Sequence, residues 1–121
     1  MPVSTNGQLT VGDVLNVLEG ELLCGEDDLD EVVEDFGATD LLSDVLAMDK
    51  EDYVLLTGLT NAQIIRTAEI TNAKAVVIVR GKQPQPAAVT LAKRGGVPLI
   101  LSNYSMFEAC FRIGDLAKQR A

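Results

Sequence analysis

The sequence predicts an α/β fold, a three-layer sandwich built around a mostly parallel sheet. Short, continuous apolar runs at residues 53–57, 75–79 and 97–101 are typical of strands that are covered on both faces. Stretches with helical spacing of apolar residues lie between these runs, at 61–71 and 84–94, and another ends the chain. Strands and helices that alternate through short loops favour parallel pairing with right-handed crossovers.

The N-terminal half predicts shorter and less regular elements. We expect a flexible arm at residues 1–9 and a single domain at residues 10–121, a length that suits one hydrophobic core. Thr10 and Asp13 have the spacing of a helix N-cap pair, with apolar residues behind them. The other elements expected here are a strand at Glu21–Cys24, a strand at 32–37, and a helix at 41–48 capped by Thr39 or Asp40.

Helix boundaries are marked more clearly in the C-terminal half. Thr60 with Gln63, and Ser105 with Glu108, have the spacing of capping boxes, in which two side chains bind the free backbone N–H groups of the first turn. The glycine pair at 95–96 is expected to end a helix, with one glycine in the left-handed conformation. The side chains expected to face inward from the last helix are Met106, Phe107, Cys110 and Ile113.

Composition excludes several classes of function. The chain has 121 residues, a formal net charge of −8 and no histidine. The negative charge works against binding to nucleic acid or to an anionic membrane. The lack of histidine removes the usual Ser-His-Asp and Cys-His catalytic arrangements and every histidine-based metal site. Cys24 and Cys110 form no C-x-x-C motif and no apolar leader precedes them, so we expect two reduced thiols and a cytoplasmic location.

Glycine and polar residues follow each of the three predicted core strands. The carboxyl ends of parallel strands meet at one edge of the sheet, where ligands bind in such folds. Capped helix N-termini at that edge favour anions. We therefore predict a site there for a small anionic ligand. The candidate ligand-binding residues are Gly58, Thr60, Asn61, Arg80, Gly81, Lys82, Ser102 and Ser105.

An alternative interpretation is that these loops only begin helices, with Gly58 permitting a tight turn. The chain has neither the G-x-x-x-x-G-K-[ST] phosphate loop nor the G-x-G-x-x-G dinucleotide motif. The predicted site therefore depends on the expected geometry of the strand ends.

The acidic segment at residues 25–35, GEDDLDEVVED, is a second candidate site. Asp28 and Asp30 have the alternate spacing of a calcium loop, but counting from Glu26 or Asp28 supplies neither the glycine at position six nor the glutamate at position twelve. We interpret the segment as a solvated acidic loop or as a docking patch for a basic partner, and we assign no metal ligands.

Two long segments carry a resemblance to a known family. They are VLLTGLTNAQIIRTAEITNAKAVVIVRGKQP and LAKRGGVPLILSNYSMFEACFRI, with LLSDVLA ahead of them. In the spacing of its strands and loops, the chain resembles the DRTGG domain family. Leu59 and Thr60 stand near the position of the family's Asp-Arg pair. Val79, Arg80 and Gly81 stand near its Thr-Gly-Gly, of which only the last glycine remains.

The resemblance implies a fold similar to the N-terminal domain of HPr kinase/phosphorylase. It also implies a regulatory role, because family members occur attached to phosphotransacetylase domains and to paired CBS modules. Short stand-alone copies resemble bacterial proteins encoded beside iron-only hydrogenases in anaerobes. A homodimer is a reasonable expectation for such a small module.

Three function hypotheses follow. The first is a non-catalytic regulatory or ligand-sensing module that binds a small anionic metabolite or a nucleotide at the carboxyl edge. The alternative is an accessory subunit for protein interaction, linked for example to iron-only hydrogenase or kinase systems, without a small-molecule site. The third is an enzyme, for which no catalytic residue and no cofactor can be assigned. The expected partners are a second copy, a small anion or a protein, and neither nucleic acid nor membrane.

Overall fold

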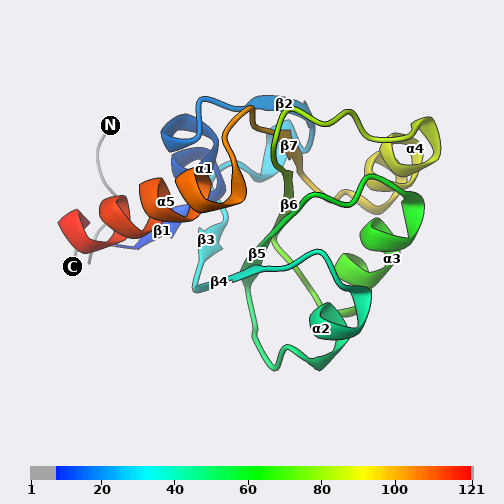
Figure 1. Cartoon of the computed structure of the whole chain (residues 1–121), viewed down its shortest axis with the longest axis horizontal. Helices are drawn as coiled ribbons and strands as arrows, with labels where there is room; N and C mark the ends of the chain where they lie inside the picture. Colours follow the sequence, from blue (N-terminus) through cyan, green and yellow to red (C-terminus); the bar gives the residue numbers. More distant parts are fainter. Residues whose placement is uncertain (1–7, 121) are drawn as a thin grey trace.

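The computed structural model describes residues 8–120 and confirms the three-layer α/β arrangement. The middle layer is a five-stranded sheet made of β2 (Glu21–Cys24), β4 (Asp35–Ala38), β5 (Tyr53–Thr57), β6 (Ala75–Ile78) and β7 (Leu99–Leu101). The strand order is β2-β7-β6-β5-β4 (Figure 1). Strands β4 to β7 pair in parallel, and β2 pairs antiparallel with β7 at one edge, so the sheet is mostly parallel as predicted.

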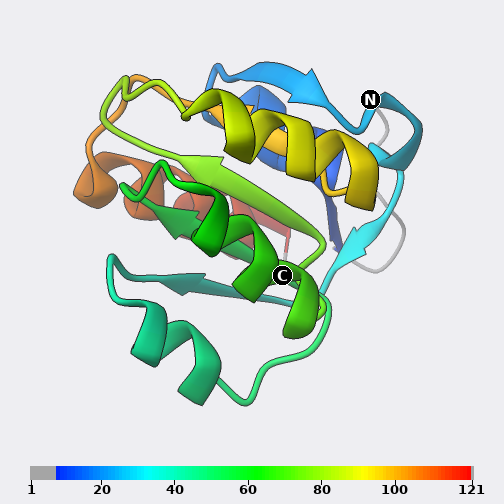
Figure 2. The ribbon, with the colours of Figure 1, turned by 90° about the vertical axis from the view of Figure 1, so that its right-hand side faces the viewer.

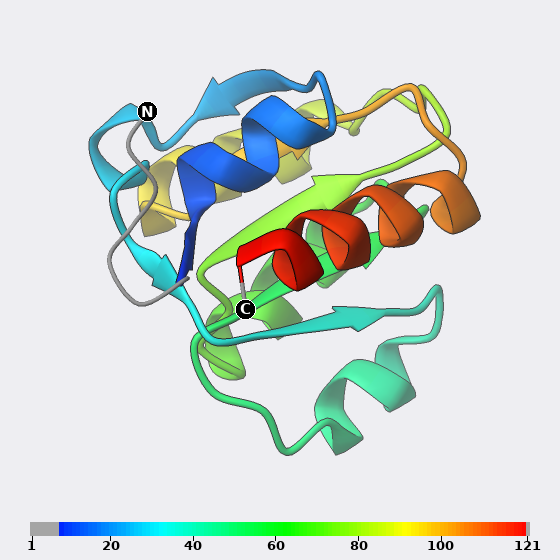
Figure 3. The ribbon, with the colours of Figure 1, turned by 90° about the vertical axis from the view of Figure 1, so that its left-hand side faces the viewer.

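Helices cover both faces of the sheet. The helices α2 (Leu42–Ala47), α3 (Ala62–Ile70) and α4 (Pro86–Gly95) lie on one face (Figure 2), and α1 (Val11–Val17) and α5 (Met106–Arg120) lie on the other (Figure 3). Successive residues of each strand point to opposite faces. Leu55 and Val76 therefore pack with the first set of helices, and Val54 and Val77 pack with the second. Burial on both faces explains why these strands appear in the sequence as unbroken apolar runs.

Several predicted boundaries are confirmed. The strands at Glu21–Cys24 and Tyr53–Thr57 begin and end where they were expected. Thr10 Oγ1 accepts a hydrogen bond from the backbone N–H of Asp13 at 3.2 Å, and the Asp13 carboxylate accepts one from the backbone N–H of Thr10 at 2.9 Å. Gly96, with φ of 68°, ends α4 in the left-handed conformation.

The segment expected as one strand at 32–37 is two strands. β3 (Val32–Val33) pairs antiparallel with β1 (Leu9–Thr10) in a small separate sheet, and β4 begins at Asp35 in the main sheet. The chain changes sheets at Glu34, whose N–H donates to the carbonyl of Asp52 at 2.8 Å. Leu9 was placed in the arm but lies in β1 and is buried. Gln8 is exposed and belongs to no strand, and residues 1–7 of the proposed arm lie outside the described residues.

Two predicted caps are wrong. The N-cap of α3 is Asn61 rather than Thr60, and its side-chain oxygen accepts from the N–H of Ile64 at 3.2 Å. Neither Thr39 nor Asp40 caps α2, because that helix begins after Leu41 without a side-chain cap.

A third predicted cap is present in part. Ser105 Oγ accepts from the N–H of Glu108 at 3.1 Å, whereas the Glu108 carboxylate accepts from Arg112 Nε at 2.9 Å.

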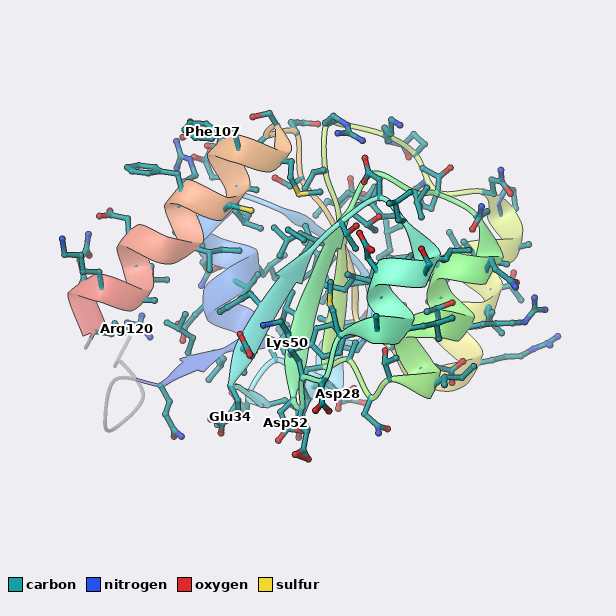
Figure 4. All side chains as sticks on the ribbon, turned by 60° about the horizontal axis from the view of Figure 1, so that its bottom comes forward. Asp28, Glu34, Lys50, Asp52, Phe107 and Arg120 are labelled. Carbon is teal, nitrogen blue, oxygen red and sulfur yellow. The ribbon has the colours of Figure 1, made fainter. Side chains whose placement is uncertain are left out.

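The inward face of α5 also differs from the prediction. Ala109 and Ile113 are buried, but Phe107 is 80% exposed and points away from the sheet (Figure 4), and Cys110 is exposed. Residues three or four apart share one face of a helix, so Ala109 and Ile113 lie on the covered side while Phe107 and Cys110 lie on the other. Cys110 is therefore not the core residue that the sequence predicted.

Candidate functional site

The carboxyl ends of β5, β6 and β7 lie side by side, and each is followed by one of the candidate loops. Backbone hydrogen bonds join these loops. The N–H of Arg80 donates to the carbonyl of Tyr104 at 2.7 Å, and the N–H of Gly81 donates to the carbonyl of Ser102 at 2.9 Å. The N–H of Gln85 donates to the carbonyl of Thr60 at 2.9 Å. The predicted meeting of the three strand ends is therefore present.

Gly58, Arg80 and Lys82 come together at this edge. Lys82 Nζ donates to the carbonyl of Gly58 at 3.3 Å. The guanidinium of Arg80 lies so close to the Cα of Gly58 that a β-carbon at position 58 would sit 1.8 Å from Arg80 Nη2. The lack of a side chain at position 58 is thus what lets the Arg80 guanidinium approach so closely.

The backbone at Arg80 and Gly81 is left-handed. Both residues have φ of 66°, a conformation that is uncommon for a residue other than glycine. The hydrogen bonds from Arg80 and Gly81 to the loop after β7 hold this turn in place. The turn fixes the backbone from which the Arg80 side chain reaches over Gly58.

Asp40 belongs to the site, and the sequence analysis missed this role. Its Oδ1 accepts from the N–H of Gly58 at 2.7 Å and from the hydroxyl of Thr57 at 3.5 Å. Its Oδ2 accepts from Arg80 Nη2 at 2.9 Å. The hydrogen bond from Arg80, followed by that from the N–H of Gly58, lowers the pKa of Asp40 below its ordinary value.

The place of Asp40 follows from the strand order. β4 lies beside β5 with Ala38 opposite Leu56, so two residues further on Asp40 comes next to Gly58. The signal in the sequence is a carboxylate just beyond a strand. It could be recognised only once that strand was known to be the fourth parallel strand at the same edge.

The remaining candidates have structural roles. Ser102 is 2% exposed, and its hydroxyl donates to the carbonyl of Leu18 at 3.2 Å and accepts from the N–H of Tyr104 at 3.3 Å. It therefore ties β7 to the end of α1 and does not face the edge. The side-chain oxygens of Asn61 and Ser105 cap α3 and α5.

The donors that remain suit an oxyanion. A backbone N–H, a guanidinium and an ammonium group converge there, and all three bind carboxylate or phosphate oxygens. Arg80 and Lys82 carry two positive charges against the single carboxylate of Asp40, so positive charge is in excess at this point of an acidic protein. Within residues 8–120, no three Cys, Asp or Glu side chains are grouped to hold a metal ion.

Depressions also lie elsewhere on the molecule. One of about 350 Å³ is at the amino edge of the sheet, where Glu69, Lys74 and Gly96 line it among other residues. Figure 4 shows Asp28 and Asp52 at this edge, so its surroundings are acidic. Another, of about 310 Å³, lies between α1 and α5 and is lined in part by Val17 and Phe111.

Comparisons with known proteins agree with this architecture. A model of the DRTGG domain matches residues 13–116. The chain is similar to a crystal structure of the CBS and DRTGG domains of the regulatory region of Clostridium perfringens pyrophosphatase, complexed with the activator diadenosine tetraphosphate. The TM-score is 0.71 with 16% sequence identity, over 98% of this chain and 49% of that one.

This likeness concerns the fold, and the chain spans about half the length of that structure. No match was found among curated proteins. Among the described helices, none is both long and apolar enough to cross a membrane. The family model covers most of the chain, and the protein therefore belongs to the DRTGG domain family.

Proposed function

We propose that this protein is a non-catalytic regulatory module that senses a small anionic metabolite or a nucleotide at the carboxyl edge of its sheet. One observation carries the proposal. The N–H of Gly58 and the guanidinium of Arg80 converge there and already hold a carboxylate, with Lys82 beside them. An arrangement that binds one carboxylate offers the same donors to the oxygens of a phosphate group.

One similar structure supports a nucleotide as the ligand class. The similar pyrophosphatase structure contains DRTGG and CBS domains with the activator diadenosine tetraphosphate. The polyphosphate of such a ligand is strongly anionic, so it would be attracted to the positive charges of Arg80 and Lys82 on a protein whose net charge is negative. The position of the site at Gly58, Arg80 and Lys82 is our proposal for this chain.

The proposal is tested by ligand-induced stabilisation. Purified protein is heated with diadenosine tetraphosphate, ATP, inorganic pyrophosphate or acetyl phosphate. A ligand at a hundredfold excess over its dissociation constant stabilises the native state by about 2.7 kcal/mol. We expect a selective rise in melting temperature with one class of phosphate ligand, and a dissociation constant that calorimetry can measure.

Paired variants locate the site. Arg80→Gln with Lys82→Gln removes two positive charges at the edge and keeps most of each side-chain stem. Lys93→Gln with Arg94→Gln removes the same charge from the exposed end of α4 and is the matched control. We expect the first pair to abolish stabilisation by the ligand and the second to retain it. Equal binding by both would remove Arg80 and Lys82 from the site.

A specific observation also favours the alternative, docking of another protein. Large apolar side chains are exposed on three helices, with Phe107 at 80% and Phe111 at 60% on α5, Ile70 at 72% on α3, and Leu46 at 59% on α2. Phe107 and Phe111 are four residues apart and lie on the same side of α5, and exposed apolar side chains that gather in this way often mark an interface. A homodimer through α5 would appear as twice the monomer mass in light scattering, and Phe107→Ser with Phe111→Ser would return it to a monomer. A wild-type monomer at every concentration would reject self-association.

A further inference from the structure

Asp40 occupies the donors that the proposed ligand would need. Its two oxygens bind three groups, the N–H of Gly58 at 2.7 Å, Arg80 Nη2 at 2.9 Å and the hydroxyl of Thr57 at 3.5 Å. A backbone amide, a hydroxyl and a guanidinium are the usual partners of a bound oxyanion. The carboxylate of Asp40 is thus bound as a ligand carboxylate or phosphate would be.

The contact lies where Asp40 can leave without opening the core. Its side chain is 44% exposed and stands on the bend between β4 and α2. Asp40 does not cap the short helix α2. The residue between them, Leu41, is 59% exposed. Displacing Asp40 therefore breaks surface hydrogen bonds and one ion pair, while the packing of Val45 in the core is kept.

The backbone that carries the donors, in contrast, is held firmly. Arg80 is fixed in the left-handed conformation by the hydrogen bond of its N–H to the carbonyl of Tyr104. Residues in such conformations persist where the surrounding structure enforces them, and they gather at binding sites. Gly58 is buried and has the space for the Arg80 guanidinium only because it lacks a side chain. A movable carboxylate thus faces donors whose backbone is fixed.

Lys82 gives a ligand an advantage over Asp40. Among residues 8–120 the ammonium group of Lys82 makes no ion pair, and it lies against the carbonyl of Gly58 at 3.3 Å. Asp40 brings one negative charge to this site, whereas a phosphate or pyrophosphate brings two or more and can engage Arg80 and Lys82 together.

We propose that Asp40 is an internal competitor for the anion site, so that a phosphate-bearing ligand binds by displacing its carboxylate from Gly58 and Arg80. This inference rests on the proposed function and concerns how ligand binding at the same site is regulated. The ligand moves the bend between β4 and α2, and the ligand-free protein holds its site closed with its own side chain. Only molecules in which Asp40 has left the site can bind the ligand. The apparent association constant is therefore the intrinsic constant multiplied by the fraction of molecules whose site is open.

The test compares the affinities of Asp40 variants and a control variant for inorganic pyrophosphate by calorimetry. Asp40→Ala removes the competitor, and Asp40→Asn removes its charge while keeping its shape. Asp49→Asn, in the loop that leads to the amino end of β5, removes the same charge away from the site and is the control. If the site is open in about one molecule in ten, freeing it raises the affinity about tenfold, which is about 1.4 kcal/mol.

We expect Asp40→Ala to bind pyrophosphate about tenfold more tightly than Asp49→Asn, and Arg80→Gln added to Asp40→Ala to abolish the gain. Equal affinity of the Asp40 and Asp49 variants, with binding that still depends on Arg80, would refute competition and leave the proposed function standing. Weaker binding by Asp40→Ala would also refute it, because Asp40 would then support the site. No Arg80-dependent binding in any variant would refute both proposals.

A second measurement keeps the test independent of affinity. The amide of Gly58 is hydrogen-bonded to a carboxylate in the free protein, so its nitrogen–proton NMR signal reports the occupant. We expect pyrophosphate to shift this signal and to shift the amides of Thr39 and Leu41 as the bend moves. A ligand that shifts Gly58 while Thr39 and Leu41 stay unchanged would contradict displacement.

Discussion

Replacing Gly58 with alanine places a methyl group where the Arg80 guanidinium now lies. The added carbon would sit 1.8 Å from Arg80 Nη2 and 2.7 Å from its Cζ, so one of the two groups must move. Arg80 ends in a flexible side chain that is 39% exposed, and it can swing into solvent at little cost. The guanidinium then leaves Asp40, and the proposed anion site loses one of its donors.

The magnitude for stability follows from the contacts that are lost. A partly exposed ion pair such as Arg80 with Asp40 contributes about 0–1 kcal/mol. Glycine to alanine at a compatible backbone stabilises by about 0.4–1 kcal/mol through the unfolded chain, and Gly58 is outside the left-handed region that would forbid it. We therefore expect the free energy of unfolding to change by no more than about 1 kcal/mol.

Urea unfolding measures the stability of Gly58→Ala, and calorimetry with pyrophosphate measures its binding. We expect near-normal stability with binding weakened at least about tenfold, which is the effect of losing one charge-assisted hydrogen bond.

Gly81→Ala is the contrasting variant. Position 81 has φ of 66° and a β-carbon there would lie 3.1 Å from Asn103 Oδ1, so alanine should cost stability as well. Normal binding by Gly58→Ala would refute the role of Arg80, and a loss above about 3 kcal/mol would refute the claim that Arg80 can move aside.

Three further predictions concern the fold and its charges. Leu55→Ala, at a fully buried position of β5, should lower the free energy of unfolding by about 2–5 kcal/mol in urea denaturation, whereas Leu46→Ala at an exposed position should change it by about 0.5 kcal/mol or less. Thr10→Ala breaks the capping pair with Asp13 and should cost about 1 kcal/mol, seen as a lower melting temperature. The lowered pKa of Asp40 means that its carboxylate stabilises the fold above its unfolded pKa of about 3.9 and that this contribution is lost as pH falls through the folded pKa. The stability gap between wild type and Asp40→Asn should therefore be constant from pH 6 to about pH 5 and close below about pH 4, and a gap that widens on acidification would contradict it.

The sheet was predictable because its strands are buried on both faces. The unbroken apolar run at Tyr53–Thr57 has one interpretation, and the structure places β5 at the same residues. The segment at 32–37 was harder, since β3 and β4 differ only in the sheet that they join. That choice depends on β1, which is two residues long and pairs with β3 across an intervening helix and strand.

The last helix shows why a buried face cannot always be derived from apolar residues. At 3.6 residues per turn, Met106, Phe107, Cys110 and Ile113 fall within about a third of the helix circumference, so they predict one apolar face. Of these four only Ile113, at one border of that face, is buried. The structure buries the side that contains the small residue Ala109. The larger Phe107 remains outside, and it is now part of a candidate interface.

The candidate site was predictable in position but not in content. Adjacent parallel strand ends bring Gly58, Arg80 and Lys82 together, as the sequence indicated. Ser102 was misplaced because a residue that follows a strand can still point into the layer behind it. Asp40 was missed because its role requires the strand order β6-β5-β4, which one sequence without its structure does not give.

The most direct test of the central claim is a nitrogen–proton NMR titration of the intact protein with diadenosine tetraphosphate. The account predicts saturable shifts that concentrate on the amides of Gly58, Arg80 and Gly81, and that vanish in Arg80→Gln with Lys82→Gln. Absence of shifts, or shifts that concentrate at the opposite edge around Gly96 and Lys74, would contradict an anion site at the carboxyl edge.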